Sequence, residues 1–147
     1  MGRLRLSDWG TGGLRSAQRD GAAQTTARVR QLVDGIEEAL RDRDDLALAR
    51  FLAPPLLARM AATAASIAAT GGVLNPARSG LRWSESRRKP GGPGRCWLRL
   101  RFEDLTYCRY PEGVITAPAR THEVEVEIET VGAPWRLCRI VELPERT

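Results

Sequence analysis

The chain has 147 residues, of which 42% are apolar and 28% are charged, and its net charge is +5. The length supports one hydrophobic core, and the composition excludes a disordered or fibrous chain. Of the 23 basic residues only Lys89 is a lysine. The surplus of positive charge favours an anionic partner without requiring one.

The first 24 residues mix Gly, Arg, Ser and Gln without hydrophobic periodicity, which predicts a flexible basic tail at 1–24 and a single domain at 25–147. The tail lacks the apolar centre of a signal peptide, and no window approaches the ~20 apolar residues of a membrane span. The three cysteines, at 96, 108 and 138, have no metal-ligand spacing. We therefore expect a cytoplasmic protein with reduced thiols, no metal and no cofactor.

Three helices are predicted ahead of residue 72. Apolar residues recur at helical spacing between positions 29 and 40, after the N-cap candidates Thr25 and Thr26. An aspartate at 44 or 45 can cap a short second helix, and the prolines at 54 and 55 suit the first turn of a third. Gly71 and Gly72 then end the helical part of the chain.

Beyond Gly80 the hydrophobic period changes from 3.6 to 2, which predicts strands. We expect strands at 81–88, 95–102, 121–130 and 135–143, with a turn at 110–113 followed by a short extended segment. The apolar positions change phase at Glu103-Asp104, which predicts a β-bulge there and a bend in the sheet.

The faces of the last two strands predict their register, because a slip of one residue would bury the glutamates. Ile128 is expected opposite Leu137, Val124 opposite Val141, and Glu129 opposite Arg136. The same register places Arg139 on the inner face opposite Val126, places Cys138 on the outer face opposite Glu127, and places His122 on the inner face opposite Leu143.

Helices followed by an antiparallel meander predict an α+β fold in which N-terminal helices pack on one face of a strongly bent antiparallel sheet. Several short segments support a family resemblance. They are Arg43-Asp44 after the first helix, Phe51-Leu52 to Pro55-Leu56 at the third helix, the turn YPEGVI, and Trp135 followed by RLCRI. With these segments, residues 26–143 resemble the cone-shaped NTF2-like superfamily (a cystatin-like cone), and within it the Tim44-like domain.

This resemblance implies a fold more than an activity, because the segments are packing motifs. Proteins of the superfamily include ligand-binding and peptide-binding modules, membrane-associated and ribosome-associated proteins, and isomerase-like or dehydratase-like enzymes. No catalytic set of those enzymes can be matched residue by residue here. We expect a non-catalytic binding or accessory domain that holds an apolar or amphipathic ligand, a peptide or a protein partner.

Two alternatives remain open from the residues. A small acid/base enzyme would use Asp104 with Tyr107 or His122 inside the cone. An anion-binding module for RNA or an anionic membrane surface would use the first hairpin, where two tryptophans are interleaved with basic residues. Its candidate residues are Arg82, Arg87, Arg88, Lys89 and Arg95.

The main hypothesis has its own candidate residues. A ligand in the cone would contact His122 and Arg139 from the last hairpin, with Trp135 and Met60 nearby. The glutamates at 123, 125, 127 and 129 are expected on a solvated outer face, paired with arginines of neighbouring strands. A homodimer through the sheet and a peripheral position at a membrane are also compatible with the sequence.

Overall fold

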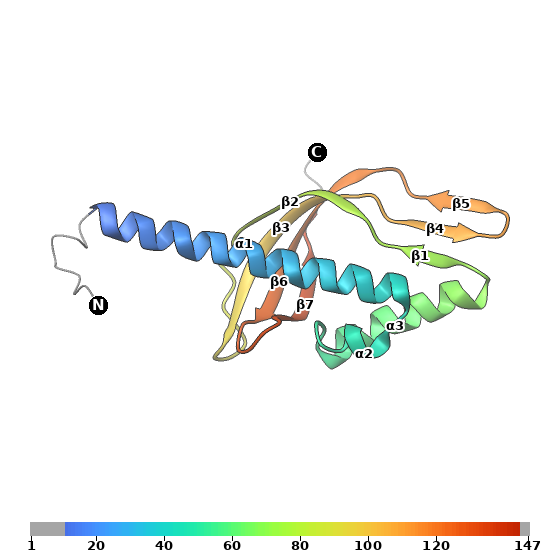
Figure 1. Ribbon diagram of the computed structural model, residues 1–147, viewed down its shortest axis with the longest axis horizontal. Helices are drawn as coiled ribbons and strands as arrows, with labels where there is room; N and C mark the ends of the chain where they lie inside the picture. The colour runs from blue at the N-terminus through green and yellow to red at the C-terminus, as the bar shows by residue number, and fades with distance from the viewer. Residues whose placement is uncertain (1–10, 145–147) are drawn as a thin grey trace.

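The computed structural model describes the backbone of residues 11–144 and the side chains of residues 21–144. Three helices precede seven strands among these residues (Figure 1). The helices are α1 (Thr11–Asp42), α2 (Asp45–Leu48) and α3 (Pro54–Ala69). The strands are β1 (Val73–Asn75), β2 (Arg78–Glu85), β3 (Arg95–Asp104), β4 (Tyr107–Tyr110), β5 (Gly113–Thr116), β6 (Arg120–Glu129) and β7 (Arg136–Glu142).

The first helix begins at Thr11 and not near Thr25, so the predicted helix start is wrong. Residues 11–24, expected in the tail, continue the helix, whereas residues 1–10 lie outside the described part. Thr26 does not cap the helix but lies within it, where its hydroxyl accepts a hydrogen bond from Trp83 Nε1 at 2.8 Å. The domain boundary at residue 25 stays a prediction.

The second and third helices begin as predicted. The side chain of Asp44 accepts a hydrogen bond from Ala47 N at 3.0 Å, which makes it the N-cap of α2. Two prolines occupy the first turn of α3, where their missing N–H groups cost nothing. Gly71 follows α3 with a φ of 83°, a conformation that favours glycine.

The core lies between the helices and one face of a four-stranded antiparallel sheet of order β2-β3-β6-β7. The inner face of this sheet carries the apolar positions of β3 and β6, and α1 and α2 contribute the facing side chains. The most deeply buried are Val29, Leu32, Leu48, Leu52, Val126 and Ile128. The α+β fold class, with helices on one face of the sheet, is confirmed.

The antiparallel pair of β3 and β6 continues beyond the four-stranded sheet as the hairpin of β4 and β5. Two residues, Leu105 and Thr106, stand between β3 and β4, and three, 117–119, stand between β5 and β6. The prediction of a bulge at Glu103-Asp104 is wrong, because β3 stays in regular register with β6 through Asp104. A register shift lies instead on β2, between Ser79 and Arg82.

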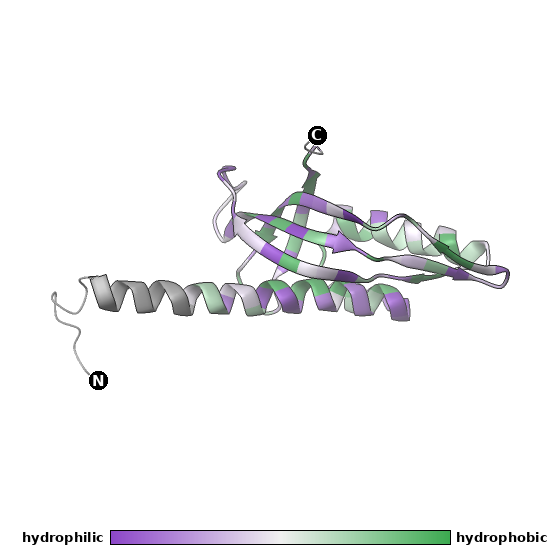
Figure 2. Cartoon of the chain, turned by 90° about the horizontal axis from the view of Figure 1, so that it is seen from above, coloured by the Kyte–Doolittle hydropathy of each residue, from purple (hydrophilic) through white to green (hydrophobic). Residues whose placement is uncertain are grey.

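Together β1, β4 and β5 form a separate three-stranded antiparallel sheet of order β1-β4-β5, which we call the arm. In Figures 1 and 2 the arm extends toward the same end of the molecule as α3. Tyr110 of β4 packs beside Gly72 and Ile67, which ties one face of the arm to the end of α3. The predicted turn at 110–113 closes the β4–β5 hairpin.

The register of the last hairpin is right at its turn and wrong beyond it. Ile128 lies opposite Leu137 and Glu129 opposite Arg136, as predicted. A register shift then makes Cys138 an extra residue on β7, so Val124 lies opposite Glu142 and not Val141. Every later residue of β7 changes face as a result.

Candidate functional site

The bulge at Cys138 moves Arg139 to the outer face, which corrects its predicted place in the cone. Arg139 lies opposite Glu127, the position predicted for Cys138. Its Nε donates to Glu127 Oε1 at 3.0 Å. Arg139 and His122 are therefore on opposite faces of the sheet, and they do not share a ligand site.

The inner face is filled by core packing. Met60 and Trp135 are partly buried against the core cluster. A cavity between the three helices, bordered by Ala39, Leu48 and Ala64, has a volume of only about 50 Å³. Pockets for small organic ligands usually need roughly 300 Å³ or more. The structure does not bring Met60, Trp135 and His122 together into one cavity, and their ligand-binding role stays a prediction.

His122 lies on the inner face at the end of β6, as predicted. Its ring stacks on Phe102 with centroids 5.7 Å apart, and its Nε2 accepts a hydrogen bond from Arg120 Nε at 3.2 Å. Asp104 Oδ2 is 3.8 Å from the same nitrogen, which is too long for a hydrogen bond. His122 is therefore held by stacking and by an arginine, not by a catalytic carboxylate.

Asp104 has a local structural role. Its Oδ1 accepts a hydrogen bond from Thr106 N at 2.9 Å, which stabilises the step from β3 into β4. Tyr107 begins β4 and pairs with Asn75 and Thr116 in the arm. The acid/base set of Asp104, Tyr107 and His122 is not assembled as a hydrogen-bonded unit.

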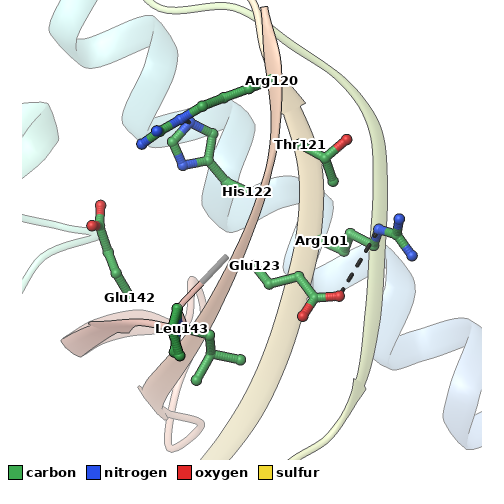
Figure 3. Close-up of a pocket in the computed structure, with 8 residues that line it drawn as sticks. Arg101, Arg120, Thr121, His122, Glu123, Glu142 and Leu143 are labelled. Atoms are coloured by element: carbon green, nitrogen blue, oxygen red, sulfur yellow. Dashed lines mark hydrogen bonds and ion pairs between the residues drawn. The ribbon is translucent and has the colours of Figure 1, made fainter. Parts of the chain in front are cut away.

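A pocket of about 460 Å³ lies at the rim beside His122 (Figure 3). Arg120, His122 and Glu142 lie on one side of β6 in this view, and Arg101, Thr121 and Glu123 lie on the other. Leu143 N donates to Glu123 O at 3.0 Å, which is where the pairing of β6 with the C-terminal segment ends among the described residues. The lining is mainly polar and carries both signs of charge.

The outer face is not solvated as predicted, because Glu125 and Glu127 are buried. Glu127 is fully buried and accepts hydrogen bonds from Arg139 and from Gly91 N, the latter at 2.7 Å. Glu125 accepts hydrogen bonds from Ser86 Oγ and from Arg88 Nε. The connection between β2 and β3 therefore folds back over the outer face and is fixed there by two carboxylates.

These contacts shift the acidity of both carboxyl groups. The hydrogen bond from Arg139 lowers the pKa of Glu127, with help from Gly91 N–H, against the opposite effect of burial. The hydrogen bond from Ser86 lowers the pKa of Glu125, and Arg88 adds to the effect. Both groups are thus held in the charged form that the folded loop requires.

Trp97 lies at the centre of this outer cluster. Its ring is 6% exposed, and the guanidinium groups of Arg88 and Arg139 lie 5.3 and 5.1 Å from its centre. A ring covered in this way is not free to stack on a nucleic-acid base. Its Nε1 is buried with no hydrogen-bond partner among the described residues.

The predicted anion-binding residues therefore divide into two groups. Arg88 pairs with Glu125, and Arg95 lies 3.6 Å from Glu127. All five residues are exposed, but Arg82, Arg87 and Lys89 form no ion pair among the described residues. The two paired arginines belong to the outer cluster, and the anion-binding role of all five residues stays a prediction.

Apolar side chains are exposed on the arm and just before it. Val114 and Ile115 of β5 are 55% and 65% exposed, and Val73 and Leu105 are also exposed. Strand β5 is the last strand of the arm, and no described strand pairs with its outer edge. Exposed apolar strands with an open edge are uncommon in proteins that stay alone, because they are templates for pairing.

The fold is similar to two solved structures. The intermembrane space region of the chloroplast protein ARC6 aligns with a TM-score of 0.60 and 17% identity, over 80% of this chain and 95% of that one. An uncharacterized protein with a cystatin-like fold from Caulobacter vibrioides aligns with a TM-score of 0.50 and 10% identity, over 81% of this chain and 89% of that one. No model of a known protein family and no curated protein matches the sequence.

At these identities the likeness establishes the fold alone. The chain has an α+β cystatin-like fold of the NTF2-like type. Within the described residues, no helix is both long enough and apolar enough to span a membrane.

Sequence reasoning missed the exposed strand β5 and the loop over the outer face. The segment VIT was expected to be extended, but its three residues do not reveal which strand lies beside them. The bulge on β7 did leave a signal. Apolar side chains are spaced by two from Trp135 to Leu137 and by three from Leu137 to Ile140, the phase change that an inserted residue causes.

Proposed function

We propose that this domain is a non-catalytic binding module of the NTF2-like superfamily, related to the Tim44-like branch, that takes a protein partner on its arm. The observation that carries the proposal is the open edge of β5 with its exposed Val114 and Ile115. A partner with an extended apolar segment can add to this edge through backbone hydrogen bonds and cover both side chains.

The placement of the polar groups supports binding over catalysis. Asp104 is bonded to a turn, and His122 is stacked on Phe102 and bonded to Arg120. The buried glutamates of β6 are bonded to the loop that covers them. Asp104, His122 and these two buried glutamates therefore already serve the fold, whereas the apolar groups of the arm lack a covering element among the described residues.

The test is a capture experiment from the native host, with variants that change one exposed residue each. Ile115→Lys places a charge on the arm, and Val131→Lys is a matched control, because Val131 is 70% exposed but lies in the turn between β6 and β7. We expect a partner that is retained by the wild-type and Val131→Lys proteins and lost by Ile115→Lys. A partner that is retained by all three would contradict binding on the arm.

A further inference from the structure

We propose that two copies of this chain associate by antiparallel pairing of β5 with β5, which joins two arms into one continuous sheet. This inference rests on the proposed function, because it names the partner of the same surface. Three observations support it: the contrast between β5 and the other sheet edges, the backbone geometry of β5, and the absence of charged side chains in its segment.

The other strand edges in the described part of the molecule carry features that limit pairing. Leu137 N donates to Phe51 O at 2.7 Å and Ala53 N donates to Leu137 O at 2.8 Å, so the segment ahead of α3 occupies the edge of β7 at Leu137. A register shift and arginines interrupt β2. Strand β1 has three residues and lies against α1 and α3. These are the usual devices against edge pairing, and β5 has no such covering element.

The hairpin determines which backbone groups of β5 point outward. Tyr110 pairs with Gly113 across a turn of two residues, and such a pair can be joined only by direct mutual hydrogen bonds. Because the direction alternates along a strand, the N–H and C=O groups of Ile115 point to β4. Those of Val114 and Thr116 point to the open edge.

This alternation selects one register for a symmetric pair. If the two-fold axis passes through Ile115, Val114 of one copy lies opposite Thr116 of the other, and all outward N–H and C=O groups of both residues find partners. The two Ile115 side chains then face each other across the axis, on the face of the arm that also carries Cys108. An axis through Val114 would leave Thr116 unpaired.

The charge of the segment favours a second copy over an unrelated chain. In a two-fold pair a charged residue near the axis approaches its own equivalent, and like charges directly opposite are destabilising. Residues 113–119, GVITAPA, contain no charged side chain. Val, Ile and Thr are also the residue types that form favourable cross-strand pairs. Pairing of β5 with β5 uses the open edge of both copies, so it stops at a dimer.

The interface is small, because β5 has four residues. Stable dimers usually bury well over 1,000 Å², so we expect a dissociation constant in the micromolar range, and no permanent dimer. Sedimentation velocity at micromolar protein concentrations measures this dissociation constant. The wild-type protein should shift from monomer to dimer with concentration.

Two substitutions at Thr116 test whether the backbone N–H of this residue holds the dimer together. Thr116→Pro removes an outward N–H that β4 does not use, and proline is tolerated on an edge strand. Thr116→Val keeps the N–H. We expect at least a tenfold weaker dimer for Thr116→Pro, little change for Thr116→Val, and equal melting temperatures. Equal dimerisation of both variants would overturn the inference.

A disulfide tests the register. Opposed residues of a non-hydrogen-bonded pair have Cα atoms about 4.5 Å apart, within disulfide range. In a Cys108→Ser background, which prevents a bond between neighbouring strands, Ile115→Cys should form a covalent dimer on mild oxidation. Val114→Cys should not, because its equivalents are displaced by two residues, about 7 Å along the strand. Equal crosslinking of both would contradict the register.

The outcomes also separate this inference from the proposed function. A wild-type protein that stays monomeric, yet loses a heterologous partner on Ile115→Lys substitution, would overturn the dimer and leave binding on the arm intact. A monomer whose arm variants change no interaction would overturn both.

Discussion

The four-stranded sheet and the arm differ in how far their faces and edges are covered by other parts of the chain. In the four-stranded sheet, helices cover the inner face, the β2–β3 connection covers Glu125 and Glu127 on the outer face, and a chain segment bonds to the β7 edge at Leu137. In the arm, apolar side chains of β5 are exposed and its outer edge has no described neighbour. The comparison teaches that this chain can cover a sheet edge with its own segments, and that β5 differs because no described segment covers it.

The largest expected effect is on the outer cluster of the four-stranded sheet. Glu127→Ala should lower the free energy of unfolding by about 3–5 kcal/mol, because it leaves Arg139 and Gly91 N without their buried acceptor. Glu129→Ala is the matched control on the same strand, since Glu129 is partly exposed and its nearest arginine nitrogen is 3.9 Å away. Its cost should stay under about 0.5 kcal/mol. Urea unfolding of both variants measures the difference, and equal costs would contradict the role of the cluster.

A smaller loss is expected from Gly35→Ala in α1. A Cβ at this position would lie 2.3 Å from the ring of Phe51. Because α1 packs closely against the α2–α3 segment here, the substitution should lower the free energy of unfolding by about 1–3 kcal/mol. Gly21→Ala in the same helix meets no atom within 4 Å. That variant should be stabilised by up to about 1 kcal/mol through helix propensity. Thermal unfolding of the pair distinguishes packing from propensity.

Acid should weaken the outer cluster. The pKa values of Glu125 and Glu127 are lowered in the folded state, so their contribution is full above the usual glutamate pKa of 4.5 and is lost as pH falls through the folded values. Burial raises the pKa of Glu37, which acts in the opposite direction. We expect stability to fall below about pH 4.5 and the slope to flatten in Glu127→Gln. An unchanged slope would contradict the assignment.

The smallest effect on stability is expected in the arm. Ile115→Lys should change the free energy of unfolding by less than about 0.5 kcal/mol, because the side chain is 65% exposed. The same change should abolish association through β5. A loss of stability as large as that of Glu127→Ala would show that Ile115 is packed, and would remove the contrast between the two regions.

The alternation of apolar residues was enough to predict the fold class, the helices' side of the sheet and the turn of the last hairpin. It failed where one residue was inserted, because the bulge at Cys138 exchanges the faces of Arg139 and its neighbours. It also failed for Glu125 and Glu127. Periodicity places a side chain on a face, but it does not say that a glycine-rich loop will cover that face.

The candidate site was harder to predict than the fold. Exposure of β5 depends on which strands are neighbours, and the segment GVIT is too short to show this by periodicity. The residues singled out for chemistry, Asp104 and His122, instead hold a turn and a strand end.

Amide hydrogen exchange at β5 tests the central claim most directly. Val114 N–H and Thr116 N–H should exchange slowly in concentrated protein and rapidly after dilution, because only the partner strand protects them. Leu137 N–H, which donates to Phe51 O within the chain, should exchange at the same rate in both conditions. Exchange at Val114 and Thr116 that does not depend on protein concentration would contradict the account.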